Sequence, residues 1–273
     1  MLNDARAADR IIAHYVLERQ LSDQLRCAPP ENRSATYTEV YKRLFASLPD
    51  HPQQDPNPGH SARVDAQLRE IKRHIAPGAI FLELGCGDAA LGFAAAGKVS
   101  TVYGLDVTDA LVDFASAPQN FRFLHSSGTN VPLPAATVDF AYSNQLLEHL
   151  HPEDAVEQLQ EVRRVLKPGG RYMCVTPSRV SGPHDISCYF DYEATCLHLR
   201  EYDYRSLRTL FREAGFQSIS CHALLRGLEL RLPYSVIRTL ECSMLMLPDR
   251  LRARLTLLEP IRTILGLTII GVK

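Results

Sequence analysis

Short apolar runs alternate with longer segments of helical spacing from residue 62 onward. The apolar runs have the length of strands and occupy 79–84, 101–106, 121–125, 138–143 and 171–177. Between them, apolar positions recur every three or four residues, which predicts helices at 62–75, 88–97, 108–117 and 153–167. Strands that alternate with helices form a parallel sheet covered on both faces. We therefore expect a doubly wound α/β fold, whose ligands bind outside the carboxyl ends of the strands.

The flanking segments extend this core on both sides. Helical spacing at 5–27 and 37–47 precedes a stretch, 48–60, that holds four prolines and one glycine and so predicts a linker. After the core come a helix at 204–216 and a strand at 217–225. The expected division is N-terminal helices and linker at 1–60 and one domain at 61–273, with a core at 79–225, a helical insertion at 226–266 and a closing strand at 267–273.

Composition excludes several classes of protein. The 30 basic and 31 acidic residues give a net charge of −1, which disfavours nucleic acid as a partner. The seven cysteines are scattered and form no CxxC pair, so the sequence predicts neither a metal site nor a disulfide framework. The first residues have no apolar leader, and no run reaches the roughly 18 apolar residues of a membrane-spanning helix. We expect a cytoplasmic protein.

The first predicted strand ends in a glycine turn, within the stretch FLELGCGD at 81–88. Gly85 and Gly87 allow a ligand to approach the backbone closely, because no Cβ intrudes. A P-loop is excluded because no lysine follows before Lys98. A pyrophosphate is disfavoured because Asp88 begins the helix and Glu83 adds a second negative charge. The residues therefore favour a ligand with positive charge, and the remaining alternative is a structural turn in which Asp88 caps the helix.

A second acidic residue refines this interpretation. Asp106 ends the second predicted strand about 20 residues after the glycine turn, where an acidic side chain accepts hydrogen bonds from ribose hydroxyls in such sheets. The expected ligand thus combines a ribose with a cationic part. S-adenosylmethionine has both.

The order of these motifs resembles the class I S-adenosylmethionine-dependent methyltransferase family, in particular its type 11 group, which is of the small-molecule type. The stretch 131–177, with its EH pair at 148–149 and LKPGG at 166–170, is similar to the middle of that family, and the likeness covers 79–225. It implies a Rossmann-like, mostly parallel sheet of seven strands, with the last strand antiparallel at the edge. LKPGG is expected to be a helix stop and turn.

The resemblance also implies cofactor-binding roles. Glu83, Gly85 and Gly87 would line the methionine and ribose side, Asp106 would bind the ribose, and Val107 would pack on the adenine. An acidic residue that many members use for the adenine is replaced here by Ser127, so Ser127 and Gly128 are expected to contribute loop backbone and a hydroxyl contact. Ser143 and Asn144, at the end of the fourth strand, would face the methionine portion.

Methyl transfer needs a general base only when the acceptor must lose a proton, and histidine is the usual candidate near neutral pH. His184, beside Asp185 in the loop after the fifth strand, is the first candidate, because an adjacent carboxylate can orient an imidazole. His149 of the EH pair is the second, although the pair more often orders its loop. His184, Asp185 and His149 are therefore the predicted catalytic residues.

The acceptor side is expected to come from segments outside the core. The loop 182–204 carries five aromatic residues, and the helices before the core add Tyr37 and Tyr41. We expect transfer to oxygen or nitrogen of a small acceptor, with a hydrophobic metabolite among the options. The alternatives are a non-catalytic scaffold that binds S-adenosylmethionine, a methyltransferase held at a membrane, and an NAD-dependent dehydrogenase. The apolar, arginine-containing segment 230–266 is expected to cover the sheet, form a homodimer contact or touch a membrane peripherally.

Overall fold

The computed structural model describes residues 4, 6–51, 59–225 and 228–273, so most of the predicted linker lies outside the described residues. Its centre is an eight-stranded sheet with the order β3-β2-β1-β4-β5-β8-β6-β7. The strands are β1 (Ile80–Leu84), β2 (Thr101–Asp106), β3 (Phe121–His125), β4 (Val138–Asn144), β5 (Leu166–Thr176), β6 (Ser218–Leu225), β7 (Leu228–Leu232) and β8 (Leu267–Val272). β1 to β5 pair in parallel, while β8 is antiparallel to both of its neighbours. The predicted fold class is confirmed, with eight strands instead of seven.

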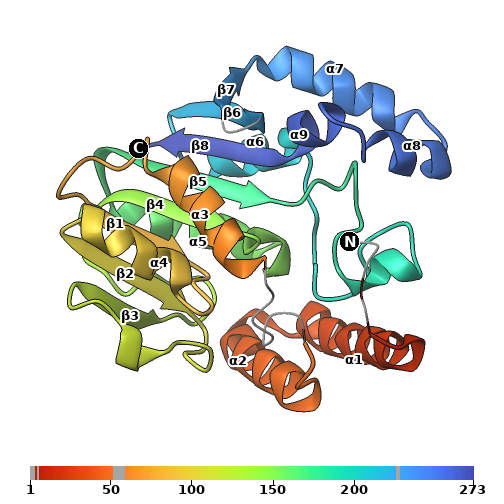
Figure 1. The fold of residues 1–273 in the computed structure, drawn as a ribbon, viewed down its shortest axis with the longest axis horizontal. Coiled ribbons are helices and arrows are strands. Elements are labelled where there is room, and N and C mark those ends of the chain that lie inside the picture. The colour runs from red at the N-terminus through yellow and green to blue at the C-terminus, as the bar shows by residue number, and fades with distance from the viewer. Residues whose placement is uncertain (1–3, 5, 52–58, 226–227) are drawn as a thin grey trace.

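Helices cover both faces of this sheet. The helices of the described residues are α1 (Ala8–Cys27), α2 (Pro30–Ser47), α3 (His60–Ile71), α4 (Ala90–Ala95), α5 (Asp154–Val165), α6 (Tyr204–Glu213), α7 (Tyr234–Leu245), α8 (Asp249–Leu255) and α9 (Ile261–Leu265). α1 and α2 form a separate pair beside the sheet (Figure 1). Figure 1 shows α3 and α4 in front of the sheet and α5 and α6 behind it. α2 begins earlier than predicted because Pro30 occupies its first turn, where a missing amide hydrogen costs nothing.

Alternation along the strands divides the core into two layers. On β1, Phe81 packs with the α3 and α4 layer, and its neighbour Leu82 packs with the α5 and α6 layer. Both side chains are completely buried. Strands covered on both faces need apolar residues at every position, which explains the continuous apolar runs in the sequence.

Strand order places a crevice between β1 and β4. The chain proceeds from β1 outward to β3 and then returns to β4 on the other side of β1. At such a reversal the loops that follow neighbouring strands diverge, which leaves room for a ligand at the carboxyl ends. The predicted glycine turn and Asp106 lie at these ends, after β1 and at the end of β2.

Two local predictions are wrong. The predicted helix at 108–117 is a turn followed by the short 3-10 helix η2 (Phe114–Ser116). The side chain of Asp113 accepts a hydrogen bond from the amide of Ala115, so it caps this turn and competes with a continuous helix. LKPGG does end α5 but belongs to β5, because Gly169 and Gly170 pair through backbone hydrogen bonds with Lys273.

The predicted position of the last strand is also wrong. β8 lies between β5 and β6 and not at the edge, which is formed by β7. β7 lies inside the segment predicted as a helical insertion, and the remainder of that segment forms α7, α8 and α9 as expected. Across the ranges that the structure describes, no helix combines the length and the apolarity that a membrane crossing requires.

Candidate functional site

A cavity of about 420 Å³ lies at the carboxyl ends of β1, β2 and β4. The strand ends and their loops form its floor, and side chains of α2 and α3 form the opposite wall. Of the predicted cofactor-binding residues, those that line it are Glu83, Gly85, Gly87, Asp106, Val107, Gly128 and Asn144. The volume falls within the range of roughly 300–1,000 Å³ typical of small-molecule sites.

The glycine turn needs its glycines for two different reasons. Gly85 has a φ of +68°, and a Cβ there would lie 3.0 Å from Cδ1 of Leu146. Gly87 has a φ of +52°, and a Cβ there would meet no atom within 4 Å. Among the described residues, this side of Gly87 is thus open out to 4 Å, which suits the close approach of a ligand to the backbone.

Glu83 presents a buried carboxylate at this turn. The residue is 7% exposed, and its Oε2 atom has no hydrogen-bond partner among the described residues. Burial raises the pKa of Glu83 to about 8; the nearby amide of Gly92 opposes this rise, and the negative charges of Asp88 and Asp106 add to it. A carboxylate in such surroundings becomes ionised readily only when a cation binds beside it.

Asp106 joins the glycine turn to the end of β2. Its Oδ2 accepts a hydrogen bond from the amide of Gly87 at 2.9 Å, and its Oδ1 accepts one from the amide of Val107 at 2.7 Å. Burial raises the pKa of Asp106, although these amides favour the charged form. Oδ1 also accepts from the amide of Thr108 at 3.3 Å, so Oδ2 is the oxygen that keeps capacity for a further hydrogen bond from a ligand hydroxyl.

Two predicted cofactor-binding residues do not line the cavity. Ser143 is fully buried, and its hydroxyl forms a hydrogen bond of 2.7 Å with the hydroxyl of Tyr172. Ser127 donates a hydrogen bond of 2.6 Å to Oδ1 of Asn130. Its neighbours Ser126 and Gly128 do line the cavity, so the loop after β3 contributes to the site without the hydroxyl of Ser127.

The α2 wall supplies the expected aromatic surface. Tyr37 and Tyr41 line the cavity as predicted for the acceptor side, and Phe45 extends their row along the helix. The hydroxyl of Tyr37 donates to Asp154 at 2.9 Å and accepts from the amide of His151 at 2.6 Å, which fixes α2 to the start of α5. Polar side chains that were not predicted from the sequence also line the cavity, among them His60, Arg63, Gln67, Thr108 and Gln158.

His149 lies beside this aromatic wall and lines the cavity. Its Nδ1 is 3.0 Å from the carbonyl oxygen of Leu197, which can only accept, so Nδ1 carries the hydrogen. Nε2 therefore keeps its lone pair and has no hydrogen-bond partner among the described residues. Burial, followed by the charge of His198 beside it, lowers the pKa of His149 to about 3. The imidazole is consequently a neutral hydrogen-bond acceptor.

The charge that faces His149 is part of a buried network. Burial would lower the pKa of His198, but its hydrogen bond to Glu201 and the nearby Glu148 outweigh burial and raise the pKa to about 9. The rings of His149 and His198 meet edge to face with centroids 4.8 Å apart. The charge of His198 thus adds to burial in keeping His149 neutral.

His184 and Asp185 lie outside the cavity lining. The backbone amide of His184 donates to the Glu201 carboxylate at 2.7 Å, and the ring atom Nδ1 of His184 lies 3.3 Å from the same carboxylate. Asp185 accepts hydrogen bonds from the amides of Ser187 and Cys196, which hold the loop after β5. These contacts give both residues a structural part in the loop, and their catalytic role stays a prediction.

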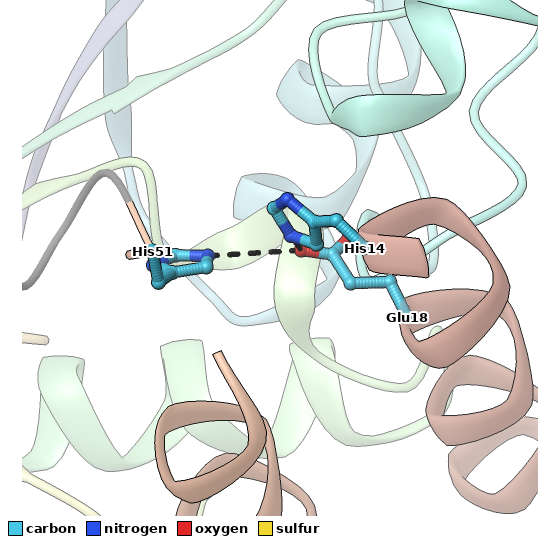
Figure 2. Close-up of side chains that lie close together, drawn as sticks. All are labelled: His14, Glu18 and His51. Atoms are coloured by element: carbon cyan, nitrogen blue, oxygen red, sulfur yellow. Dashed lines mark hydrogen bonds and ion pairs between the residues drawn. The ribbon is translucent and has the colours of Figure 1, made fainter. Parts of the chain in front are cut away.

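A second polar cluster lies within the N-terminal helices. Figure 2 shows His14 and Glu18 of α1 with His51, which follows α2. His14 Nε2 is 2.7 Å from Glu18 Oε1, and His51 Nε2 is 3.8 Å from the same oxygen. Burial would raise the pKa of Glu18, but the hydrogen bonds from the two histidines outweigh it and lower the pKa to about 2.

These three side chains have the types and spacing of metal ligands. However, Arg6 Nη2 lies 3.0 Å from His14 Nδ1 and can only donate, so Nδ1 accepts and the hydrogen of His14 is on Nε2. That nitrogen then has no lone pair for a metal ion. We interpret the cluster as a hydrogen-bonded clamp that joins α1 to the end of α2, the helix that carries the aromatic wall.

The chain is similar to known methyltransferases over part of its length. A family model described as a methyltransferase domain matches residues 82–174. A probable S-adenosylmethionine-dependent methyltransferase from Mycolicibacterium smegmatis is 32% identical over 145 residues, which make up 53% of this chain and 54% of that protein. A demethylmenaquinone methyltransferase from Lactococcus lactis is 28% identical over 171 residues, covering 52% of this chain and 67% of that protein. The chain spans about half the length of the mycobacterial relatives it matches.

Solved structures share the fold at lower identity. A SAM-dependent methyltransferase from Archaeoglobus fulgidus is 18% identical, with a TM-score of 0.54 over 85% of this chain and 100% of that chain. A 1,6-didemethyltoxoflavin-N1-methyltransferase from Burkholderia thailandensis, solved with bound S-adenosylhomocysteine, is 17% identical, with a TM-score of 0.55 over 90% of this chain and 91% of that chain.

Proposed function

We propose that the chain is an S-adenosylmethionine-dependent methyltransferase that transfers a methyl group from S-adenosylmethionine to an oxygen or nitrogen atom of a small molecule. The observation that carries this proposal is the cavity at the carboxyl ends of β1 and β2, where Glu83, the glycine turn and Asp106 come together. The aromatic wall of α2 closes the same cavity from the other side.

The residues present fit the proposed cofactor. The carboxylate of Glu83, which lines the cavity, suits an ammonium group, and the free acceptor capacity of Asp106 Oδ2 suits a ribose hydroxyl. The open side of Gly87 leaves room for a ligand against the backbone. When bound, S-adenosylmethionine supplies a methyl group already activated by its sulfonium, so the protein has mainly to align an acceptor and exclude water.

The α2 wall and His149 are proposed to bind the acceptor. Tyr37, Tyr41 and Phe45 offer an apolar, planar surface, which favours an acceptor with a hydrophobic or aromatic part. Nε2 of His149 can accept a hydrogen bond from the O–H or N–H group that becomes methylated. A pKa of about 3 is far from the neutral range in which a general base works best, so we propose that His149 mainly orients this group.

Calorimetric titration with S-adenosylmethionine and with S-adenosylhomocysteine tests the cofactor. We expect saturable binding that Asp106→Ala weakens tenfold or more, which corresponds to about 1.4 kcal/mol. Asp113→Ala is the matched control, since Asp113 is an exposed carboxylate that only caps η2. If neither nucleoside binds, or if both substitutions weaken binding equally, the proposed cofactor site is wrong.

Transfer of radiolabelled methyl groups to a panel of small phenols, amines and quinols tests the reaction. With an acceptor found, His149→Ala should lower the turnover number while the affinity for S-adenosylmethionine stays the same. His125→Ala, an exposed histidine outside the cavity lining, should change neither. Binding of the cofactor without transfer to any acceptor, in the presence of active controls, would instead favour a non-catalytic scaffold.

A further inference from the structure

Large apolar side chains are exposed together at the C-terminal helices. Four of the eleven exposed large hydrophobic residues in the described part of the chain fall within residues 246–258, which span the end of α7, the whole of α8 and the turn after it. Met246 is 86% exposed, the highest fraction among them. We call this group the apolar tip, and it consists of Met246, Leu251, Leu257 and Leu258.

The apolar tip rests on a separate small core. Val180, Met244 and Leu265 are buried beneath it and form their own hydrophobic cluster. Arg252 pairs with Asp249 at 2.7 Å, which braces α8 within one turn. The small core therefore holds α7, α8 and α9 together, and the side chains of the apolar tip do not contribute to this packing.

Two unpaired cations accompany the apolar side chains. Arg250 and Arg254 lie four residues apart on α8, so they project from the same side of the helix. Both are exposed, and neither forms an ion pair within the ranges that the structure describes. The acidic side chains nearby, Asp249 and Glu259, are already paired with Arg252 and Arg262. The apolar tip is thus accompanied by two unpaired positive charges, in a chain whose net charge is −1.

This combination of charge and apolar surface favours one occupant. In a two-fold contact between copies of this chain, Arg250 and Arg254 would approach their own counterparts, and like charges oppose such a contact. An anionic lipid surface would pair with both arginines, while the apolar side chains enter the boundary between head groups and acyl chains. We propose that the apolar tip docks the protein on membranes that carry anionic lipids.

The location of the tip is compatible with docking while the cavity stays accessible. Figure 1 shows α7 and α8 grouped near the β7 end of the sheet, whereas β3 forms the opposite edge. No residue of α7, α8 or α9 lines the cavity. Contact through the tip therefore covers none of the residues assigned to the cofactor or the acceptor.

Flotation of the full chain with lipid vesicles tests this proposal. At low ionic strength, we expect binding to vesicles of phosphatidylglycerol and phosphatidylcholine at least tenfold stronger than to phosphatidylcholine alone, and weaker binding in 0.5 M salt. Arg250→Glu with Arg254→Glu should reduce this binding tenfold or more, and so should Leu257→Ser with Leu258→Ser. All four positions are exposed, so thermal unfolding should show that these variants stay folded.

Matched controls use the same chemistry elsewhere on the surface. Arg43→Glu on α2 and Val16→Ser on α1 change an exposed arginine and an exposed apolar residue, and both should bind vesicles as the parent does. The proposal is overturned if the protein does not bind anionic vesicles, or if the controls weaken binding as much as the tip variants. A dimer in solution that the Leu257→Ser and Leu258→Ser changes dissociate, without vesicle binding by the parent, would assign the tip to self-association instead.

Discussion

Replacement of Glu83 by glutamine tests the electrostatics of the proposed cofactor site. The carboxyl group is buried at the glycine turn, and its raised pKa of about 8 means that it is mostly protonated in the empty protein at neutral pH. Only the ionised form attracts an ammonium group. Binding of S-adenosylmethionine must therefore drive loss of this proton, and the affinity should fall as the pH falls below 8.

The size of the effect follows from the fraction of Glu83 that is ionised. With a pKa of about 8, this fraction decreases about 20-fold between pH 7.5 and pH 6, and the affinity should fall by the same factor. The α-amino group of the cofactor, which titrates near pH 8 in model compounds, stays charged through most of this range. Glu83→Gln removes the titrating group, so its affinity should be nearly independent of pH here.

Calorimetry from pH 6 to pH 7.5 measures this dependence. In buffers with different ionisation enthalpies, the parent should also release close to one proton for each cofactor bound at pH 6, whereas Glu83→Gln should not. Equal pH dependence in the parent and in Glu83→Gln would refute the argument that burial holds Glu83 protonated.

Two predictions concern how the α2 wall is held. A Cβ at Gly128 would lie 2.7 Å from the ring of Tyr37, whereas a Cβ at Gly78, which also has a positive φ, would meet no atom within 4 Å. Gly128→Ala should therefore lower the free energy of unfolding, measured with urea, by about 1–3 kcal/mol more than Gly78→Ala does. Equal losses of stability in the two variants would show that the Tyr37 ring can move aside without strain. Glu18, with a folded pKa of about 2, contributes stability that is present above its unfolded pKa near 4.5 and lost as the pH falls toward 2. The stability of the parent relative to Glu18→Gln should therefore decrease by about 2 kcal/mol between pH 6 and pH 3, and a constant difference would count against the clamp.

The sequence predicts best those features that depend on neighbouring residues. The apolar runs predict where the strands lie. The sequence also predicts that Glu83, the glycine turn and Asp106 lie close together, because they stand at the carboxyl ends of parallel strands, which meet at one edge of the sheet. It is harder to predict which face of the sheet a given strand residue points to. Ser143 and Asn144 are adjacent, yet alternation turns one toward Tyr172 and the other toward the cavity.

Features that depend on distant parts of the chain were not predictable. His149 faces the cavity because Leu197, nearly fifty residues later, accepts its Nδ1 hydrogen. His184 looked more suitable from the sequence because Asp185 is adjacent, but the loop turns both toward Glu201 and Ser187. The segment 108–117 has helical spacing without forming a helix, because Asp113 bonds locally to the amide of Ala115.

The central position of β8 has a consequence for synthesis of the chain. β5 and β6 each form ladders with β8, which follows α7, α8 and α9, so both strands emerge from the ribosome well before their partner exists. Until then each presents an unpaired edge, the kind of surface on which strands of other chains assemble. At typical elongation rates of about 5–20 residues per second, the three helices delay closure of the sheet by seconds. During that interval, the nascent protein is most exposed to aggregation and most dependent on chaperones.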